Sequence, residues 1–168
     1  IQHLTHEKAD VIIASFGFNE TFQGNAGLVK FQESLKAYVS DLQTRQFNAT
    51  SGPQIVLLSP TANENTANVL AATLNNDQLR TYSQAIQKIA MELNVGFVDL
   101  FTPTEKAMGN TTTDLTINGC HLNAVGYKLV GQLMFQSLCK MPLPKLSEAV
   151  RLTVVDKNKQ FFRRFRPL

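Results

Sequence analysis

The chain has 168 residues, of which 43% are hydrophobic and 17% charged, which is enough for one compact domain with its own core. Its longest apolar runs are four residues long, and this excludes a membrane-spanning helix, since such a helix needs about 20 apolar residues. Charge is uneven, because residues 1–139 hold 8 Lys/Arg and 11 Asp/Glu (net −3), whereas residues 140–168 hold 8 and 2 (net +6). We therefore predict a domain over residues 1–139 and a basic, Phe-rich, helical extension over residues 140–168.

The first half of the chain predicts two strands with a helix between them. Residues 10–16 form a β-branched apolar run ended by Gly17, which is typical of a strand buried on both faces of a parallel sheet. Residues 54–59 repeat this pattern before Pro60, which cannot continue a central strand. Between the two runs, apolar residues recur at the spacing of one helical face: Leu28, Phe31, Leu35, Tyr38, Val39 and Leu42.

The second half predicts a third strand between two helices. A short helix is expected around residues 69–74, and Asp77 is the expected N-cap of a longer helix that ends near Asn94. Residues 97–101 are the third predicted strand, followed by a loop at Pro103. The last predicted helix carries its apolar side chains on one side: Val125, Leu129, Val130, Leu133, Met134 and Leu138.

Strands that alternate with amphipathic helices predict right-handed crossovers and a parallel sheet covered on both faces. In such sheets, ligands bind beyond the carboxyl ends of the strands. The segments that directly follow the three strands, residues 17–20, 59–65 and 102–121, are therefore the candidates for a functional site.

Two short motifs lie in these segments. The first is Gly17-Phe18-Asn19-Glu20, which directly follows the first strand and is a weak signal alone, because Asn is common in turns. The second is His121-Leu-Asn-Ala-Val-Gly-Tyr127, about a hundred residues later, at the start of the last helix. Together, over roughly residues 9–139, they resemble two of the sequence blocks that define the SGNH (GDSL-type) hydrolases.

The resemblance implies a fold and a set of roles. The fold would be α/β, a flavodoxin-like three-layer α/β/α parallel sheet, of which this chain is the C-terminal portion without the N-terminal strands. The side chain of Asn19 would stabilise an oxyanion, Gly17 would belong to the same oxyanion and substrate-binding site, and His121 would be the general base. The family implies ester hydrolysis, no cofactor and no metal, and it suggests a secreted or periplasmic protein.

The chain departs from the family pattern at two places. Asn118 occupies the position of the carboxylate that precedes the family's base by three residues, and the comparable change in a serine-protease triad costs roughly ten-thousandfold in rate. His121 would then act as half of a dyad, unless Asp114 reaches it. The Gly-Asp-Ser block that carries the nucleophile is absent, and the nine residues before the first strand cannot hold it.

No side chain in the chain replaces the missing nucleophile convincingly. Ser15 and Ser59 are expected to be buried-strand and strand-end residues. Cys120 is adjacent to His121, but neighbouring side chains in an extended loop point apart. Cys120 and Cys139 are expected to be free thiols, because the last helix would hold their sulfurs some 20 Å apart.

The missing block also leaves the sheet incomplete. In the family, the strand that matches residues 11–16 is central, so without its neighbour an apolar strand edge would face water. We therefore expect an upstream segment or a second chain to complete the sheet and to supply the serine.

Three functions are compatible with these observations. The leading hypothesis is a serine-type ester hydrolase acting on a small-molecule or carbohydrate ester, for example an acetylated sugar. The alternative is a non-catalytic binding or scaffold domain with the same fold, which Asn118 and the absent serine block favour. Nucleic-acid binding by residues 157–166 is a third reading, but a terminal helix that packs its Phe face on the domain explains the same residues, so neither nucleic acid nor membrane is an expected partner.

Overall fold

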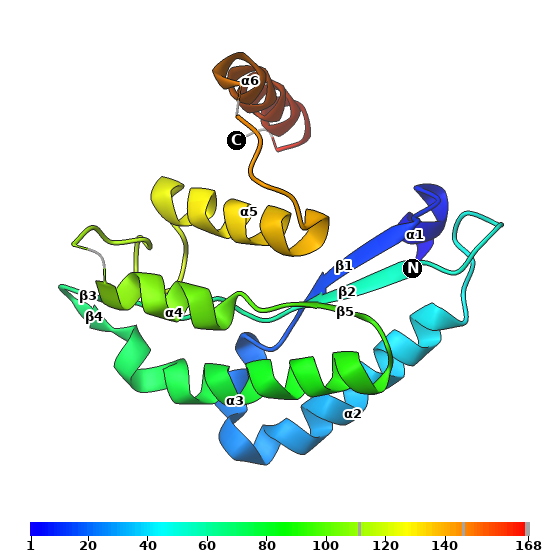
Figure 1. Ribbon diagram of the computed structural model, residues 1–168, viewed down its shortest axis with the longest axis horizontal. Coiled ribbons are helices and arrows are strands. Elements are labelled where there is room, and N and C mark those ends of the chain that lie inside the picture. Colours follow the sequence, from blue (N-terminus) through cyan, green and yellow to red (C-terminus); the bar gives the residue numbers. More distant parts are fainter. Residues whose placement is uncertain (111, 146, 167–168) are drawn as a thin grey trace.

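The computed structural model describes residues 1–110, 112–145 and 147–166; residues 111, 146, 167 and 168, which belong to the loop and extension considered above, lie outside this description. The helices and strands follow one another in the order α1 (Gln2–His6), β1 (Val11–Ser15), the 3₁₀ helix η1 (Asn19–Gln23), α2 (Gly24–Gln43), β2 (Gln54–Leu58), β3 (Asn65–Thr66), β4 (Val69–Leu70), α3 (Ala71–Glu92), β5 (Gly96–Val98), α4 (Phe101–Asn110), α5 (Ala124–Cys139) and α6 (Glu148–Phe165). Figure 1 traces this order from blue to red.

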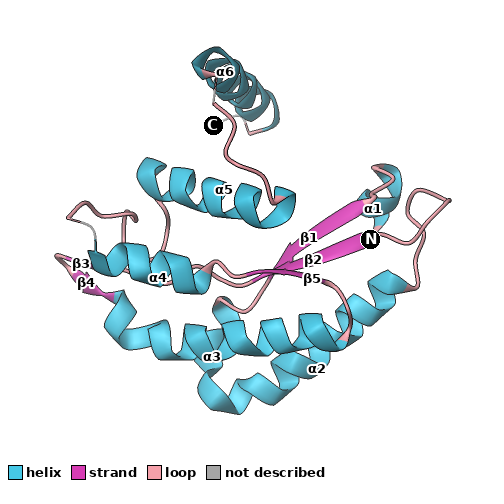
Figure 2. Ribbon diagram, in the orientation of Figure 1, coloured by secondary structure: helices cyan, strands magenta, loops and turns pink. Residues whose placement is uncertain are grey.

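Three strands form one parallel sheet in the order β1-β2-β5. The pair of helices α2 and α3 covers one face of this sheet, and α5 lies over the other (Figure 2). The predicted α/β fold with a flavodoxin-like three-layer arrangement is therefore confirmed. A separate two-stranded hairpin, β3-β4, leads into α3.

The main core lies between the sheet and the pair α2 and α3. The apolar stripe of α2 is buried at the predicted spacing, with Val39 and Leu42 fully inaccessible, and it packs on β1 and β2. Tyr82 of α3 is fully buried beside the Phe31 ring, with 5.1 Å between the ring centroids. A smaller cluster on the opposite face joins Leu58 and Val98 to the inner side of α5.

The prediction of two helices around residues 69–93 is wrong in its details. Residues 69–70 form β4, and Asp77 lies inside the single helix α3 rather than at its start. The polar residues that suggested a break make tertiary contacts instead, since Asn75 donates to the Thr21 hydroxyl and the Asn76 amide bonds both the N–H and the C=O of Asn63. Local sequence favoured a cap here, and tertiary hydrogen bonds outweighed it.

The third strand is also shorter than predicted, and a helix replaces the expected Pro103 loop. β5 ends at Val98, and α4 begins at Phe101 because Ser59 and Asp99 accept the amides of its first turn. Pro103 is tolerated there, since the first turn of a helix has no intrahelical use for the N–H that proline lacks. Ser59 is fully buried and does act as a strand-end residue, as predicted.

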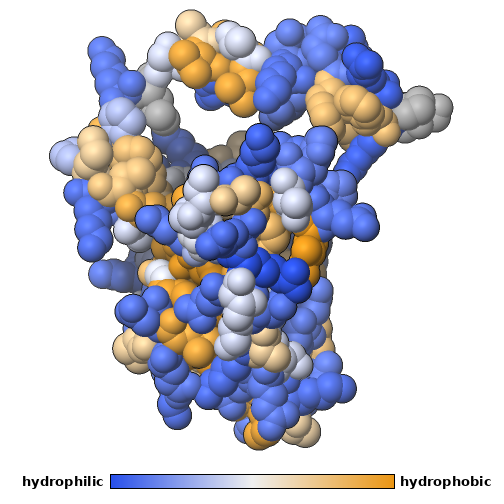
Figure 3. Space-filling model, turned by 90° about the vertical axis from the view of Figure 1, so that its right-hand side faces the viewer, coloured by the Kyte–Doolittle hydropathy of each residue, from blue (hydrophilic) through white to orange (hydrophobic). Residues whose placement is uncertain are grey.

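β1 is not buried on both faces, which corrects another prediction. Its side chains alternate, so that Ile12 is 6% exposed on the α2 and α3 side whereas Ile13 is 46% exposed on the other. Ser15, expected to be buried, is exposed as well. The reason is that α5 packs its inner side on residues of β2 and β5. Figure 3 views the molecule from the side where the strands begin, and it shows hydrophobic residues (orange) at the surface in the middle of this view.

The C-terminal extension is helical over α6, but it does not pack its Phe face on the domain as expected. Every described residue of α6 is exposed, and Phe161 and Phe165 contact each other with 4.6 Å between their ring centroids. Figure 1 shows α6 beyond α5, away from the sheet. No helix among the described residues has the length and apolar character that crossing a bilayer requires.

Candidate active site

The segment that follows β1 turns sharply at Gly17. This residue is buried with φ at +101°, and a Cβ atom there would lie 3.0 Å from Ile86 Cδ1, so both conformation and space favour glycine. The Gly17 N–H donates to Glu20 Oε2 at 3.0 Å, which closes the turn that begins η1. Burial raises the pKa of Tyr82, and the nearby Glu20 carboxylate raises it further.

Asn19 is the first residue of η1, and its side chain is exposed. Within the described part of the chain, this side chain makes no hydrogen bond. Its helical turn is nevertheless held firmly, because Thr21 is buried, donates to Phe18 O at 2.6 Å and accepts from Asn75 of α3 at 3.0 Å. Asn19 therefore presents a free amide from an anchored turn.

The loop before α5 forms a compact turn that carries Asn118 and His121. Ile117 N donates to His121 O at 2.8 Å, and Asn123 N donates to Leu115 O at 2.9 Å. Asn123 also caps α5, with its side-chain oxygen accepting the amides of Val125 and Gly126. A Cβ atom on Gly126 would collide with the carbonyl of Leu115, which explains the glycine of the second motif.

Asn118 and His121 are brought together as the motif predicted. Asn118 Oδ1 accepts the backbone N–H of His121 at 2.9 Å. The ring atom Nδ1 of His121 lies 3.2 Å from this oxygen and 3.1 Å from Asn118 Nδ2. In the tautomer that carries a proton on Nδ1, the ring donates to Oδ1 and leaves Nε2 unprotonated. Nε2 has no hydrogen-bond partner in residues 1–110, 112–145 and 147–166, so it is free to accept a proton.

The ring of His121 has no carboxylate beside it among the described residues. Asp114, the proposed substitute for the missing carboxylate, accepts from Asn123 Nδ2 through its backbone carbonyl, and no hydrogen bond joins its side chain to the ring within the described part of the chain. His121 therefore has a neutral amide where the family pattern has an anionic oxygen.

A buried carboxylate that the motifs did not single out fixes this loop. Glu64 follows β2 and is 3% exposed, and its Oε2 accepts from Leu115 N at 2.9 Å, Thr116 N at 2.8 Å and Thr116 Oγ1 at 2.7 Å. Its backbone N–H donates to Gly119 O at 2.8 Å. Each of these donors would cost about 1–3 kcal/mol if it were left buried without a partner. In the sequence, Glu64 is marked as a candidate only by its place within residues 59–65, directly after a strand.

Polar contacts through the start of α3 connect the two motif segments. Asn75 donates to Thr21, which lies in the same turn as Asn19. Asn76 bonds Asn63, and the next residue, Glu64, accepts hydrogen bonds from the His121 loop. Both segments lie beyond the carboxyl ends of the strands in Figure 1. No direct hydrogen bond joins Asn19 to His121 among the described residues, so the sheet edge rather than a side-chain contact brings the two segments to one end of the molecule.

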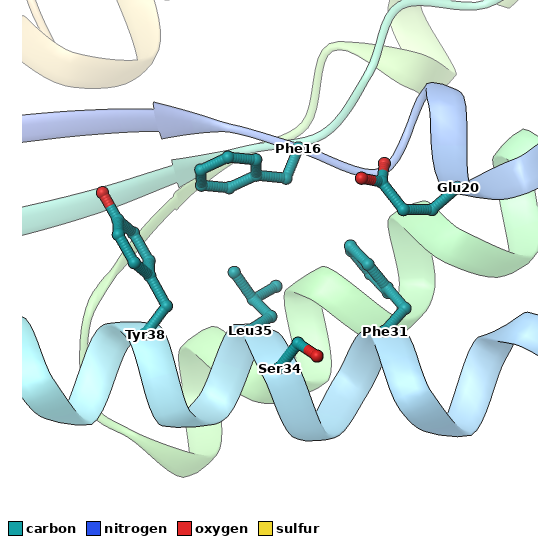
Figure 4. A pocket seen from close by; sticks show the side chains of 6 residues that line it. All are labelled: Phe16, Glu20, Phe31, Ser34, Leu35 and Tyr38. Carbon is teal, nitrogen blue, oxygen red and sulfur yellow. The ribbon is translucent and has the colours of Figure 1, made fainter.

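A pocket of about 210 Å³ lies beside β1 rather than at the His121 loop. β1 is the outer strand of the sheet, so its free edge borders this pocket. Phe16, at the end of β1, and Phe31, Leu35 and Tyr38 of α2 point into it, with Glu20 at one end (Figure 4). Its walls are chiefly apolar, and Phe16 meets Tyr38 edge to face at 5.3 Å between centroids. This pocket is space between the sheet and α2, on the face of β1 that α2 and α3 cover and beside the free edge of the strand.

The described residues contain no cluster of three His, Cys, Asp or Glu side chains that could hold a metal ion. His3 and His6 are exposed in the short helix α1. Cys120 and Cys139 are free thiols, which confirms that prediction. Burial raises the pKa of the Cys120 thiol, so this group is protonated and a poor nucleophile near neutral pH.

We predict that iodoacetamide at pH 8 modifies Cys139 at least about tenfold faster than Cys120 in the folded protein, because only a thiolate reacts and Cys139 is exposed. The rate at Cys120 should reach half its maximum at a higher pH than in the unfolded chain, since its pKa is raised by folding. Mass spectrometry of timed samples measures both rates, and guanidinium unfolding should make them similar. Equal rates in the native protein would contradict the burial of Cys120.

Comparison with solved structures found the same fold in several esterases. An acetyl-xylooligosaccharide esterase variant from Geobacillus stearothermophilus aligns with a TM-score of 0.64 at 16% identity, over 85% of this chain and 65% of that one. An acetyl xylan esterase, AlAXEase, aligns with a TM-score of 0.60 at 21% identity, over 79% and 69%. A lipase/acylhydrolase from Enterococcus faecalis aligns with a TM-score of 0.57 at 21% identity, over 84% and 67%.

The chain thus spans less than two thirds of the length of the Geobacillus esterase. Comparison with curated proteins gave no match. The sequence model of the GDSL-like lipase/acylhydrolase family, in contrast, matches residues 1–129, which include both motif segments and the β1-β2-β5 sheet. The chain belongs to the GDSL-like lipase/acylhydrolase family.

Proposed function

We propose that this chain is the part of a serine-type ester hydrolase that holds the general base and the oxyanion donor. The observation that carries the proposal is the state of His121, whose Nδ1 faces Asn118 while Nε2 is unpartnered among the described residues. An imidazole held in this way, at the ligand-binding edge of a parallel sheet, suits the removal of a proton from a nucleophile.

In the proposed reaction, a serine hydroxyl attacks the ester carbonyl while His121 Nε2 takes the hydroxyl proton. The carbonyl oxygen, which becomes negatively charged, accepts a hydrogen bond from the Asn19 amide. An interaction of this type increases the rate about a hundredfold to a thousandfold. His121 then gives its proton to the leaving alcohol, and a water molecule releases the acyl group by the same steps. We assign the donor to Asn19 and not to Gly17, because the Gly17 N–H is already bonded to Glu20.

The serine in this proposal comes from outside the 168 residues, from an upstream segment or a second chain that completes the sheet. The open flank of β1 supports this, since β1 is the outer strand of the sheet, and Val11 is 52% and Ile13 46% exposed on the face opposite α2 and α3. A folded protein normally covers such an edge. A strand paired with β1 would also bring its own carboxyl end to the edge where Asn19 and His121 lie.

The proposed substrate is a small-molecule or carbohydrate ester with a small acyl group such as acetate. Support comes from the fold shared with esterases that are described as acting on acetylated xylan or xylooligosaccharide.

Asn118 supports one further candidate, a non-catalytic binding or scaffold domain with the same fold. A neutral amide beside His121 Nδ1 can accept from the ring but brings no charge to stabilise an imidazolium. The two candidates differ in whether the protein with its serine-bearing segment hydrolyses esters at all.

The first experiment replaces His121 with Ala in the protein produced with the serine-bearing segment. Loss of the base should lower kcat for p-nitrophenyl acetate at least about a hundredfold. His6→Ala is the matched control, because His6 is exposed in α1, and it should leave kcat unchanged. An unchanged rate in the folded His121→Ala protein would overturn the proposed function.

Asn118→Asp should raise kcat at least about tenfold in the same protein, because the new oxygen can only accept from Nδ1 and its charge stabilises the imidazolium. Asn158→Asp adds the same charge on the exposed helix α6 and should have no effect. If neither the natural protein nor the Asn118→Asp variant hydrolyses esters, the binding-domain candidate is the correct one.

Two neighbouring isoleucines test whether a partner covers β1. In the 168-residue chain, Ile12→Ala should lower the free energy of unfolding by about 2–4 kcal/mol and Ile13→Ala by about 1 kcal/mol or less, because only Ile12 is buried. When the completing segment is present, Ile13→Ala should cost about 2 kcal/mol or more. Urea denaturation measures all four values, and a small cost for Ile13→Ala in both proteins would contradict the completed sheet.

A further inference from the structure

We infer that Glu64 is a positioning residue for His121, an inference that rests on the proposed function because it names a further group that the same reaction needs. Glu64 lies in the loop after β2, whereas Asn118 and His121 lie in the loop before α5, more than fifty positions later. The buried carboxylate of Glu64 accepts from the amides of Leu115 and Thr116 and from the Thr116 hydroxyl, and no hydrogen bond joins it to the His121 ring or to Asn118 among the described residues.

The bonds of Glu64 reach both arms of the His121 turn. On the first arm, the Thr116 hydroxyl donates to Glu64 Oε2 and accepts from Gly119 N at 3.0 Å. On the second arm, Gly119 O accepts the backbone N–H of Glu64. Asn118, which lies between these anchors, then holds the His121 backbone N–H and the ring. A shift of the Glu64 carboxylate would therefore move the base relative to the sheet edge.

The contacts require a carboxylate at this position. The donors around it are N–H and O–H groups: Oε2 accepts from all three, and Oε1 also accepts from Leu115 N at 3.0 Å. Whichever oxygen an amide nitrogen replaces, that nitrogen would face at least one donor with another. The fit is also tight, since a Cβ on Gly119, whose φ is +82°, would lie 2.8 Å from Glu64 O and 2.8 Å from Ala71 Cβ. The turn therefore cannot move closer to the β2 loop to compensate for a shorter or altered side chain.

The test is Glu64→Gln in the protein that includes the serine-bearing segment, assayed with p-nitrophenyl acetate. A displaced base should lower kcat about ten- to a hundredfold while KM changes less than about twofold, because the substrate does not touch Glu64. Glu105→Gln is the matched control, since it removes a carboxylate that pairs with Arg80 at 2.6 Å, and no hydrogen bond joins Glu105 to the His121 loop among the described residues. The control should lose little thermal stability, because this ion pair is partly exposed, and it should keep its kcat.

Two further measurements separate positioning from folding. Amide hydrogen exchange should become faster at Leu115 and Thr116 in Glu64→Gln and not in Glu105→Gln. If Glu64→Gln does not fold, Thr116→Val removes only the hydroxyl of the same cluster and should lower kcat about three- to tenfold.

The possible outcomes distinguish this inference from the function on which it rests. If His121→Ala abolishes hydrolysis while Glu64→Gln and Thr116→Val keep kcat, the inference about Glu64 is overturned and the proposed function stands. If Glu105→Gln lowers kcat as much as Glu64→Gln, the effect is one of general stability and the inference is again overturned. If His121→Ala has no effect, both fail.

Discussion

The candidate site depends on one buried charge. Glu64 is almost fully inaccessible, and burying an ionised carboxylate is costly unless hydrogen bonds compensate for the lost water. Here the compensating donors all come from one turn, so the position of that turn is coupled to the solvation of the charge. Because these hydrogen bonds fix the turn, they help to hold His121 in place even though it lies at the surface.

The start of α3 extends this constraint to the opposite side of the site. Successive asparagines, Asn75 and Asn76, point in two directions, the first to Thr21 in η1 and the second to Asn63 beside Glu64. Two loops that are a hundred residues apart thereby share one rigid support. Preorganisation of this kind is what an oxyanion donor and a base require, since neither can reorganise at low cost during the reaction. It is compatible with the proposed hydrolase and also with a binding site that holds an ester without cleaving it.

Periodicity in the sequence predicted the three strands of the main sheet and its layers, although the third strand ends earlier than expected, and the resemblance to the SGNH hydrolases indicated the pairing of Asn118 with His121. The sequence was not sufficient where long-range polar contacts decide local structure. Asn75 and Asp77 read as the boundary of a helix, and the partners that keep α3 continuous lie in η1 and in the β2 loop. The role of Glu64 could not be predicted either, since no neighbouring residue in the chain indicates that its carboxylate oxygens accept from Leu115 and Thr116. The uneven burial of β1 depends on where α5 packs, which periodicity does not encode.

The open flank of β1 has a thermodynamic consequence. If a separate polypeptide occupies it, binding and folding are linked, and the melting temperature of the chain rises with the concentration of that partner. If the occupant is joined to the same polypeptide, its effective concentration is fixed, in the millimolar range for a short flexible connection, and dilution leaves the melting temperature unchanged. The side chains of Val11 and Ile13 thus make the stability of this domain a measure of whether its sheet is shared between molecules or contained in one.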